Sequence, residues 1–100
     1  MPELQKCYKI EVLVDAPLVQ RIRRLAAERG IRSYRLQSTL GGTEDGGRWR
    51  DDQVTGGAGS KVLLIAIVTA VESDRFLEVL SPLVYELSLV VTRSAVESLS

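Results

Sequence analysis

The chain has 100 residues, 45% of them hydrophobic, which is enough for one domain around one core without disulfides or a structural metal. Thirteen basic and thirteen acidic side chains cancel, so no net positive field holds nucleic acid or an anionic membrane surface non-specifically. With no histidine, no asparagine and one cysteine, the chain lacks the commonest general base and the parts of a zinc or copper site. Any anion must therefore be bound by local geometry.

The same inventory bears on where the protein works. The lone thiol of Cys7 has no internal disulfide partner, and no apolar run follows a basic start as in a secretory signal, so we expect a cytoplasmic protein. The longest apolar stretch, residues 62–70, is about half the length of a membrane-spanning helix. We therefore expect the chain not to cross a membrane by itself, and we expect Cys7 to fill the core beside the first strand.

The first half of the chain predicts a strand, a helix and a second strand. Apolar and polar residues alternate over residues 8–14, which is typical of a strand. Asp15 is then predicted to cap a helix that Gly30 closes. Alternation resumes over residues 34–40 and predicts the second strand.

The second half predicts a strand, a helix and a strand again. Residues 60–70 are apolar on both faces, as in a strand covered on two sides. Ser73 is predicted to cap a second helix. Pro82 either kinks this helix or begins a separate last turn. A fourth strand, about residues 88–93, precedes a short tail.

This order predicts an α+β, ferredoxin-like βαββαβ fold in a single domain over residues 1–100. Both helices of that fold lie on one face of the sheet and leave the other face bare. Monomers rarely leave an apolar patch uncovered, so we expect an oligomer that buries this face. The predicted patch comprises Leu13, Leu63, Ile65, Ile67 and part of the pair Leu89 and Val91.

A long loop, residues 41–59, lies between the second and third strands and holds seven of the eight glycines. Such a connection inside a compact domain is usually functional or disordered. The pairs Gly41-Gly42 and Gly46-Gly47 allow positive φ, so that successive backbone amides can face an anion. Arg48 and Arg50 add planar guanidinium groups that suit phosphate or carboxylate oxygens.

Two interpretations of this loop stay open. In one, Asp51 and Asp52 pair with the arginines until a ligand displaces them, which selects one loop conformation and changes the surface that a partner meets. In the other, the loop is a disordered linker. The large apolar side chain of Trp49 favours burial against a partner or against the domain itself.

The whole chain resembles the PII-like signalling proteins. The resemblance covers residues 8–96 and rests on the order of elements, on a loop similar to the T-loop of PII proteins, and on the strand that follows it, Ser60-Lys61-Val62-Leu63-Leu64-Ile65-Ala66-Ile67-Val68. The segment Gly47-Arg48-Trp49-Arg50-Asp51-Asp52 is most similar to the carbon-regulated PII-like proteins associated with bicarbonate transporters and carboxysomes.

This resemblance implies a homotrimer with adenine nucleotide bound between subunits at the base of the loop. The implied ligands are ADP, AMP or ATP, with bicarbonate as a further candidate, and no cofactor is required. The loop would signal inorganic-carbon or energy state to a bicarbonate transporter or a carboxysome-related protein, in the cytoplasm or at the inner membrane through that partner. The implied nucleotide-binding residues are Thr39, Gly41, Gly42, Arg48, Arg50, Lys61 and Arg93.

Two departures from the PII pattern qualify this implication. The loop contains no tyrosine, so uridylylation of the kind known in nitrogen-regulating PII proteins is not supported. The C-terminal extension is short and lacks a second basic cluster, which favours ADP or AMP over ATP.

Three alternatives compete with a nucleotide-binding regulator. A passive structural oligomer needs no ligand at all. A metal-tolerance trimer of related fold would have to rely on Cys7 and scattered carboxylates, a poor soft-metal site. A small ferredoxin-like enzyme of the acylphosphatase kind needs an asparagine, and an isomerase needs a placed carboxylate base. We therefore expect no catalysis and no metal centre.

Overall fold

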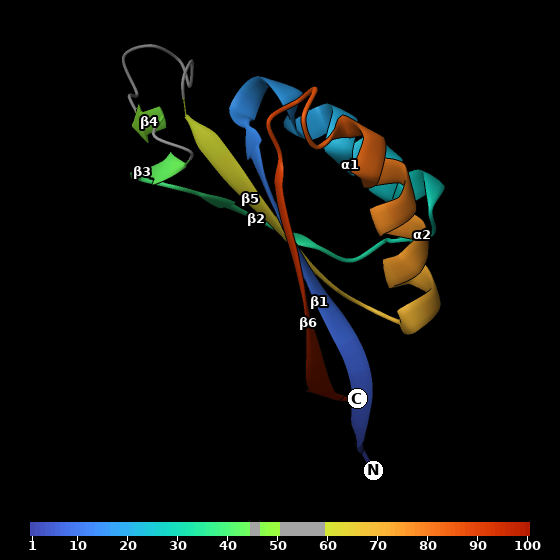
Figure 1. The fold of residues 1–100 in the computed structure, drawn as a ribbon. Helices are drawn as coiled ribbons and strands as arrows, with labels where there is room; N and C mark the ends of the chain where they lie inside the picture. The colour runs from blue at the N-terminus through green and yellow to red at the C-terminus, as the bar shows by residue number, and fades with distance from the viewer. Residues whose placement is uncertain (45–46, 51–59) are drawn as a thin grey trace.

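The computed structural model describes residues 1–44, 47–50 and 60–100 (Figure 1). The elements in chain order are β1 (Leu4–Asp15), the 3-10 helix η1 (Ala16–Leu18), α1 (Val19–Glu28), β2 (Arg35–Ser38), β3 (Gly41–Glu44), β4 (Gly47–Arg50), β5 (Lys61–Val68), α2 (Ala70–Leu80), the 3-10 helix η3 (Ser81–Leu83) and β6 (Val90–Leu99).

Strands β2, β5, β1 and β6 form one antiparallel sheet in that order, and β3 and β4 form a separate hairpin. Both α-helices lie on the same face of the four-stranded sheet (Figure 1). Because β1 and β2 are parallel and separated by β5, each half of the chain is a split βαβ unit. The predicted ferredoxin-like α+β fold is confirmed.

The core lies between the helices and one face of the sheet. Side chains at alternate positions of β1 and β5 point to this face, so Val12 lies opposite Leu64 and both are fully buried. The helices contribute Ile22 and Phe76, also fully buried. Burying each such side chain stabilises the fold by about 1.5–3 kcal/mol relative to leaving it in water.

The opposite sheet face is open, as predicted, but the β6 residues that lie on it differ from the predicted ones. Leu13 lies directly opposite Leu63 on this face, and both are half-buried in the single chain. Leu89 and Val91 were expected here in part, and that prediction is wrong. Leu89 is only 5% exposed and Val91 packs against the core, because β6 begins in a register that places Val90 on the open face.

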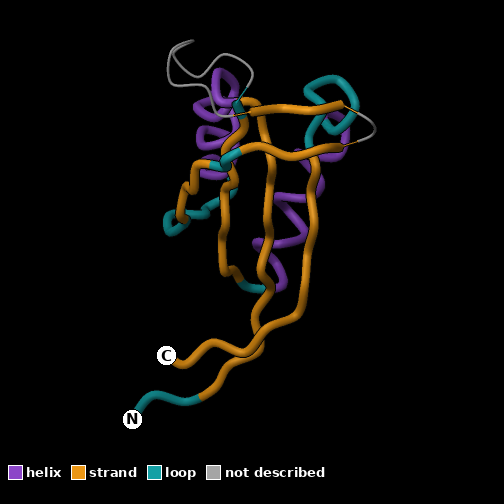
Figure 2. The backbone as a smooth tube through the Cα atoms, turned by 90° about the vertical axis from the view of Figure 1, so that its left-hand side faces the viewer, coloured by secondary structure: helices purple, strands orange, loops and turns teal. Residues whose placement is uncertain are grey.

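The edge strands differ in length from the prediction. The predicted fourth strand is present as β6, but its bounds of about residues 88–93, with a tail after them, are wrong, because β6 continues to Leu99 and pairs with β1 back to Leu4. These segments form a two-stranded ribbon that extends beyond β5 and brings the termini together (Figure 2). The predicted second strand, residues 34–40, shortens to β2. Cys7 lies in the ribbon and is half-buried, so it does not fill the core.

Helix α2 is capped by Thr69, and the predicted cap at Ser73 is wrong. The Thr69 hydroxyl accepts a hydrogen bond from the Glu72 amide (3.2 Å), and the Glu72 carboxylate accepts one from the Thr69 amide (3.0 Å). This reciprocal pair is a capping box. Ser73 is one turn inside the helix and fully buried, and Pro82 lies in the separate turn η3.

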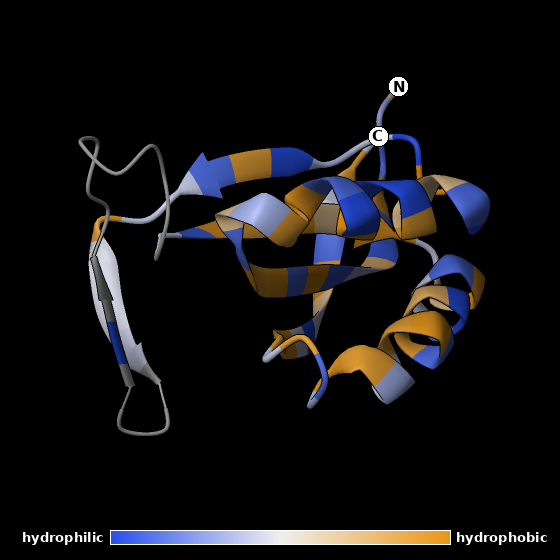
Figure 3. Cartoon of the chain, turned by 90° about the horizontal axis from the view of Figure 1, so that it is seen from above, coloured by the Kyte–Doolittle hydropathy of each residue, from blue (hydrophilic) through white to orange (hydrophobic). Residues whose placement is uncertain are grey.

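The segment 41–59 was expected to be an irregular loop, and part of it is a β-hairpin. Gly41 lies opposite Arg50 and Glu44 opposite Gly47. Viewed from above, this hairpin stands apart from the rest of the domain (Figure 3). None of the helices in the described part of the chain is long and apolar enough to cross a membrane.

Candidate functional site

The first feature of the candidate site is an ion pair where β1 ends and β5 begins. The antiparallel register places Asp15 opposite Lys61, and the Lys61 Nζ donates to Asp15 Oδ1 at 2.8 Å. The lysine side chain is 15% exposed and the aspartate side chain 44%. Asp15 was predicted to cap the first helix, but it makes no side-chain cap, because its carboxylate contacts Lys61 instead.

Thr39 joins the end of β2 to the same point. Its backbone amide and its hydroxyl both donate to the Lys61 carbonyl, at 3.3 and 2.8 Å. Next to Lys61, the buried Ser60 accepts a hydrogen bond on its carbonyl from the Ala16 amide at 3.0 Å. The start of β5 is thereby held by the chain on both sides, which fixes the backbone from which the Lys61 side chain projects.

The glycines turn the chain from this point into the hairpin. Gly41 has φ of 149°, in the region that L side chains rarely adopt, whereas Gly42 lies in the regular β3 strand opposite Trp49. A nest of successive positive-φ glycines at this pair is therefore not observed. Gly46, of the second predicted pair, lies outside the described residues.

The two loop arginines follow on β4. Arg50 lies opposite Gly41, so its backbone is at the base of the hairpin near Thr39 and Lys61. Arg48 lies opposite Thr43, closer to the tip, and its side chain is exposed. The predicted pairing of these arginines with Asp51 and Asp52 involves positions outside the described residues.

Arg93 lies elsewhere in the chain. It is opposite Ile10 in the β1–β6 register, and the five residues from there to Asp15 correspond to about 17 Å along β1. It is also separated from Lys61 by the width of β1, because β5 and β6 flank that strand. One chain therefore does not bring Arg93 close to Lys61.

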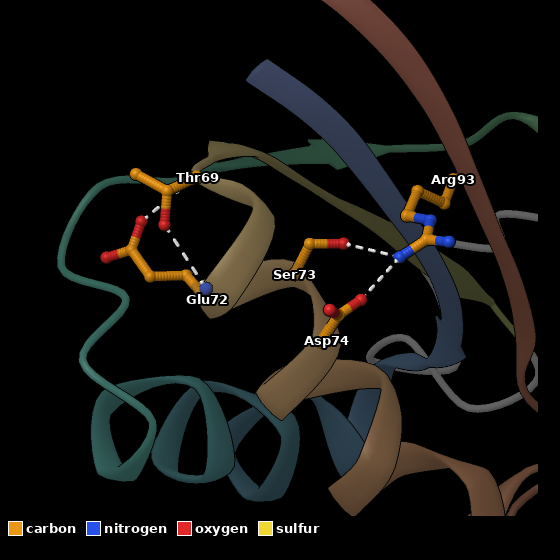
Figure 4. A network of polar contacts seen from close by, with 5 residues as sticks. All are labelled: Thr69, Glu72, Ser73, Asp74 and Arg93. Atoms are coloured by element: carbon orange, nitrogen blue, oxygen red, sulfur yellow. Dashed lines mark hydrogen bonds and ion pairs between the residues drawn. The ribbon is translucent and has the colours of Figure 1, made fainter. Parts of the chain in front are cut away.

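Arg93 is instead held against α2 (Figure 4). Its Nη1 donates to the Ser73 hydroxyl at 3.1 Å and to Asp74 Oδ1 at 2.9 Å, and its guanidinium lies 5.0 Å from the centre of the Tyr8 ring. The arginine side chain is nonetheless 38% exposed. These contacts fix the orientation of the guanidinium while leaving part of it accessible to an anion.

Sequence reasoning missed the residues that position the two cations. Asp15 and Ser73 were each predicted to cap a helix, because aspartate and serine are common N-cap residues. Nothing local in the sequence identifies Asp15 as the partner of Lys61, since 46 positions separate them. Among the described residues there is no group of three or more histidine, cysteine, aspartate or glutamate side chains that could hold a metal ion.

No protein-family model matches the sequence, and no curated protein sequence matches it either. Solved structures do match its fold. A nitrogen regulatory PII-like protein, CPII, from Thiomonas intermedia K12, bound to ADP, AMP and bicarbonate, has a TM-score of 0.88 at 19% identity, covering 96% of this chain and 91% of that chain.

Two further solved structures agree. A putative PII-like signalling protein from Thermus thermophilus has a TM-score of 0.81 at 15% identity, covering 96% and 92% of the two chains. The GlnK–ATP complex of B. subtilis has a TM-score of 0.63 at 9% identity, covering 91% and 82%. At identities this low, the structural similarity establishes the fold alone. That fold is the PII-like version of the ferredoxin-like arrangement.

Proposed function

On the premise of a PII-like fold, we propose that this protein is a regulator that binds an adenine nucleotide, ADP or AMP, at the base of the β3–β4 hairpin. The observation that carries the proposal is the position of Lys61, a mostly buried cation fixed beside Thr39, two residues before the positive-φ turn at Gly41. Solved structures of similar fold are bound to ADP, AMP and bicarbonate, or to ATP. Bicarbonate is the second proposed ligand.

In the proposed complex, the Lys61 ammonium donates to phosphate oxygens, and Gly41 and Gly42 let the backbone at the base of the hairpin approach the phosphate with no side chain in between. The Lys61 ammonium has three N–H groups, so it can hold Asp15 and a phosphate oxygen at once. Arg48 and Arg50 supply the remaining positive charge from the hairpin. Charge-assisted hydrogen bonds of this kind contribute about 1.5–3 kcal/mol each.

Arg93 enters the site from a second copy of the chain. Because it cannot reach Lys61 within one chain, one nucleotide can use both cations only across a subunit boundary. The open sheet face, with Leu13 opposite Leu63, is the apolar surface that such an assembly would bury. We propose a homotrimer, in which each boundary pairs Lys61 of one subunit with Arg93 of the next.

The proposed output is the surface of the hairpin. A ligand at its base adds contacts to β3 and β4 that exist in the bound state alone, so it favours the hairpin conformation that makes them. The proposed receiver is a bicarbonate transporter or a carboxysome-related protein, which would place the regulator in the cytoplasm or, through that partner, at the inner membrane. The protein acts by binding and not by catalysis.

The test is calorimetric titration of the purified protein with ADP, AMP and ATP, each with and without bicarbonate. We expect saturable binding, strongest for ADP or AMP, and a loss of about tenfold or more in Lys61→Gln, which keeps much of the side chain and removes its charge. Arg75→Gln, an exposed change on α2, is the matched control and should bind normally.

Absence of binding to every nucleotide would overturn the proposal and leave a passive structural module. Equal loss in Lys61→Gln and Arg75→Gln would show that net charge, and not the site at the base of the hairpin, governs binding. Limited proteolysis of the hairpin with and without nucleotide tests the output, since the proposed regulator requires that ligand alter the cleavage rate.

A further inference from the structure

The chain is neutral as a whole, but its charges are strongly segregated. Residues 16–43 contain six arginines and one acidic residue, Glu28, a surplus of five positive charges. The rest of the chain has seven basic and twelve acidic residues, a surplus of five negative charges. A cancelled net charge therefore conceals a locally basic region, which the composition alone does not reveal.

Four of these arginines are exposed along α1 and beyond its C-terminal end, with the exposed Glu28 among them, and we call them the arginine face: Arg21, Arg24, Arg29 and Arg32. The opposite side of α1 is fixed by Ile22 and Ala26, which are fully buried. None of the four arginines forms an ion pair or hydrogen bond with another side chain in the described part of the chain.

A neighbouring arginine shows what an internally used guanidinium looks like in this protein. Arg23 Nε donates to the Tyr34 hydroxyl at 2.8 Å, its Nη1 donates to Gln20, and its guanidinium lies 5.9 Å from the centre of the Tyr34 ring. Arg23 therefore has a structural role. The arginine face has none of these contacts, and its like charges repel one another unless an anion lies against them.

The C-terminal end of the arginine face, at Arg32, lies away from the nucleotide site. Arg32 borders a hollow of about 240 Å³ that is also lined by Val68, at the other end of β5 from Lys61, about 23 Å away along the strand. Because α1 lies on the helix-covered side of the sheet, association through the open face leaves it accessible (Figure 1). The exposed side of α1 is thus available in a monomer and in an oligomer.

We propose that the arginine face docks a protein partner that presents an acidic surface of aspartate and glutamate side chains. The segment 16–43 contains six arginines and no lysine. Arginine is enriched and lysine depleted at protein–protein interfaces, and the guanidinium fork matches a carboxylate. The hollow beside Arg32 is also lined by Glu72 and Val68, so it suits an uncharged side chain of the partner next to the carboxylates that contact the arginines.

Other polyanions fit these observations less well. An anionic lipid surface attracts lysine as well as arginine and makes no use of a hollow. Single-stranded nucleic acid needs exposed aromatic rings for stacking, and Tyr34, the aromatic residue of this segment, is half-buried and held by Arg23. The carboxylate surface of a protein is therefore the partner that the arginine face favours.

The test measures binding of fluorescently labelled poly-L-glutamate to the full chain at low ionic strength by anisotropy. The double variant Arg21→Gln/Arg24→Gln removes two charges from the face and keeps helix propensity, and Arg29→Gln/Arg32→Gln does the same past the helix end. The matched control is Lys6→Gln/Arg75→Gln, which removes two exposed charges elsewhere. We expect each face variant to bind about tenfold more weakly, and the control to bind within about twofold of the parent chain.

Three outcomes would overturn the proposal. The first is that the parent chain does not bind poly-L-glutamate, and the second is that the control variant loses as much affinity as the face variants. The third is that phosphatidylserine-containing vesicles or poly(U) bind through the same arginines at least as tightly at the same ionic strength. Thermal unfolding followed by circular dichroism establishes that all variants are folded before binding is compared.

Discussion

Lys61 and Asp15 face each other across the β1–β5 register, with the ammonium Nζ 2.8 Å from Oδ1. The pair has two consequences that act in opposite directions on a ligand. It holds the ammonium group in place before a phosphate arrives, which lowers the ordering cost of binding. It also offsets part of the positive charge that would attract the phosphate.

Replacing Asp15 separates these two effects. In Asp15→Asn the competing negative charge is gone while the size of the side chain is kept, so we expect nucleotide affinity to rise by roughly threefold to tenfold, about 1 kcal/mol. The free energy of unfolding should fall by about 1 kcal/mol or less, because Asp15 is 44% exposed and solvent screens the pair. Calorimetric titration and urea denaturation measure the two quantities.

The control for this variant is Glu28→Gln, which removes an exposed carboxylate that pairs with no described residue. It should leave both quantities unchanged. A fall in nucleotide affinity in Asp15→Asn would contradict the prediction and would mean that orientation of Lys61 outweighs the loss of its positive field.

Subunit mixing tests whether Lys61 and Arg93 act across a boundary. Lys61→Gln and Arg93→Gln should each bind nucleotide weakly alone. Unfolding and refolding the two variants together in equal amounts should restore binding at about a quarter of the sites, since a boundary then pairs an intact Lys61 with an intact Arg93. Titration of the mixture against each variant refolded separately measures the restored fraction.

A site built within one chain predicts a different result, because every chain in the mixture would still lack one of its two cations. Absence of restored binding in a mixture that has exchanged subunits would therefore reject the shared site. Exchange itself is verified by native mass spectrometry with one variant carrying a mass label.

In the proposed trimer, the subunits associate through the open sheet face. Leu63→Glu places a carboxylate where Leu13 and Leu63 meet, and burying an unpaired charge costs several kcal/mol, so we expect dissociation to monomers. Sedimentation velocity measures the change. Val71→Glu, on the outer surface of α2 and 58% exposed in the single chain, is the matched control and should leave the assembly intact. A Leu63→Glu protein that sediments like the parent chain would place the interface elsewhere.

The capping box at the start of α2 makes a measurable contribution to the free energy of unfolding. Thr69→Ala removes the hydroxyl that accepts from the Glu72 amide, and we expect it to destabilise the fold by about 1 kcal/mol. Thr69→Ser keeps the acceptor and should lie close to the parent chain in urea denaturation. If both variants lose the same stability, the cause is the lost methyl group and not the cap.

How far sequence reasoning reaches is clear from β1 and β5. Alternation along residues 8–14 and the continuous apolar run 62–68 predicted two central strands, and Val12 and Leu64 do lie together in the core. The run that is apolar on both faces also predicted the open face correctly at Leu63 and Ile67. These features are local periodicities, because successive side chains of a strand point to opposite faces of the sheet.

The ends of the strands and the caps were less accessible to this reasoning. Residues 94–99 have only a weak alternation of apolar and polar side chains. They form a strand because their backbone pairs with the edge of β1. Thr69 and Ser73 are both good caps, and only the packing of α2 on the sheet decides that Ser73 is buried beside Arg93.

By itself, then, the sequence determined the order and type of the main elements, the position of the glycine-rich connection and the apolar content of the open face, because each depends on neighbouring residues. Tertiary structure alone decided that Lys61 pairs with Asp15, that Arg93 is held by Ser73 and Asp74, and that the two cations lie far apart in one chain. Those relationships join residues 19 to 46 positions apart, and strand register and helix packing, not local pattern, bring such residues together.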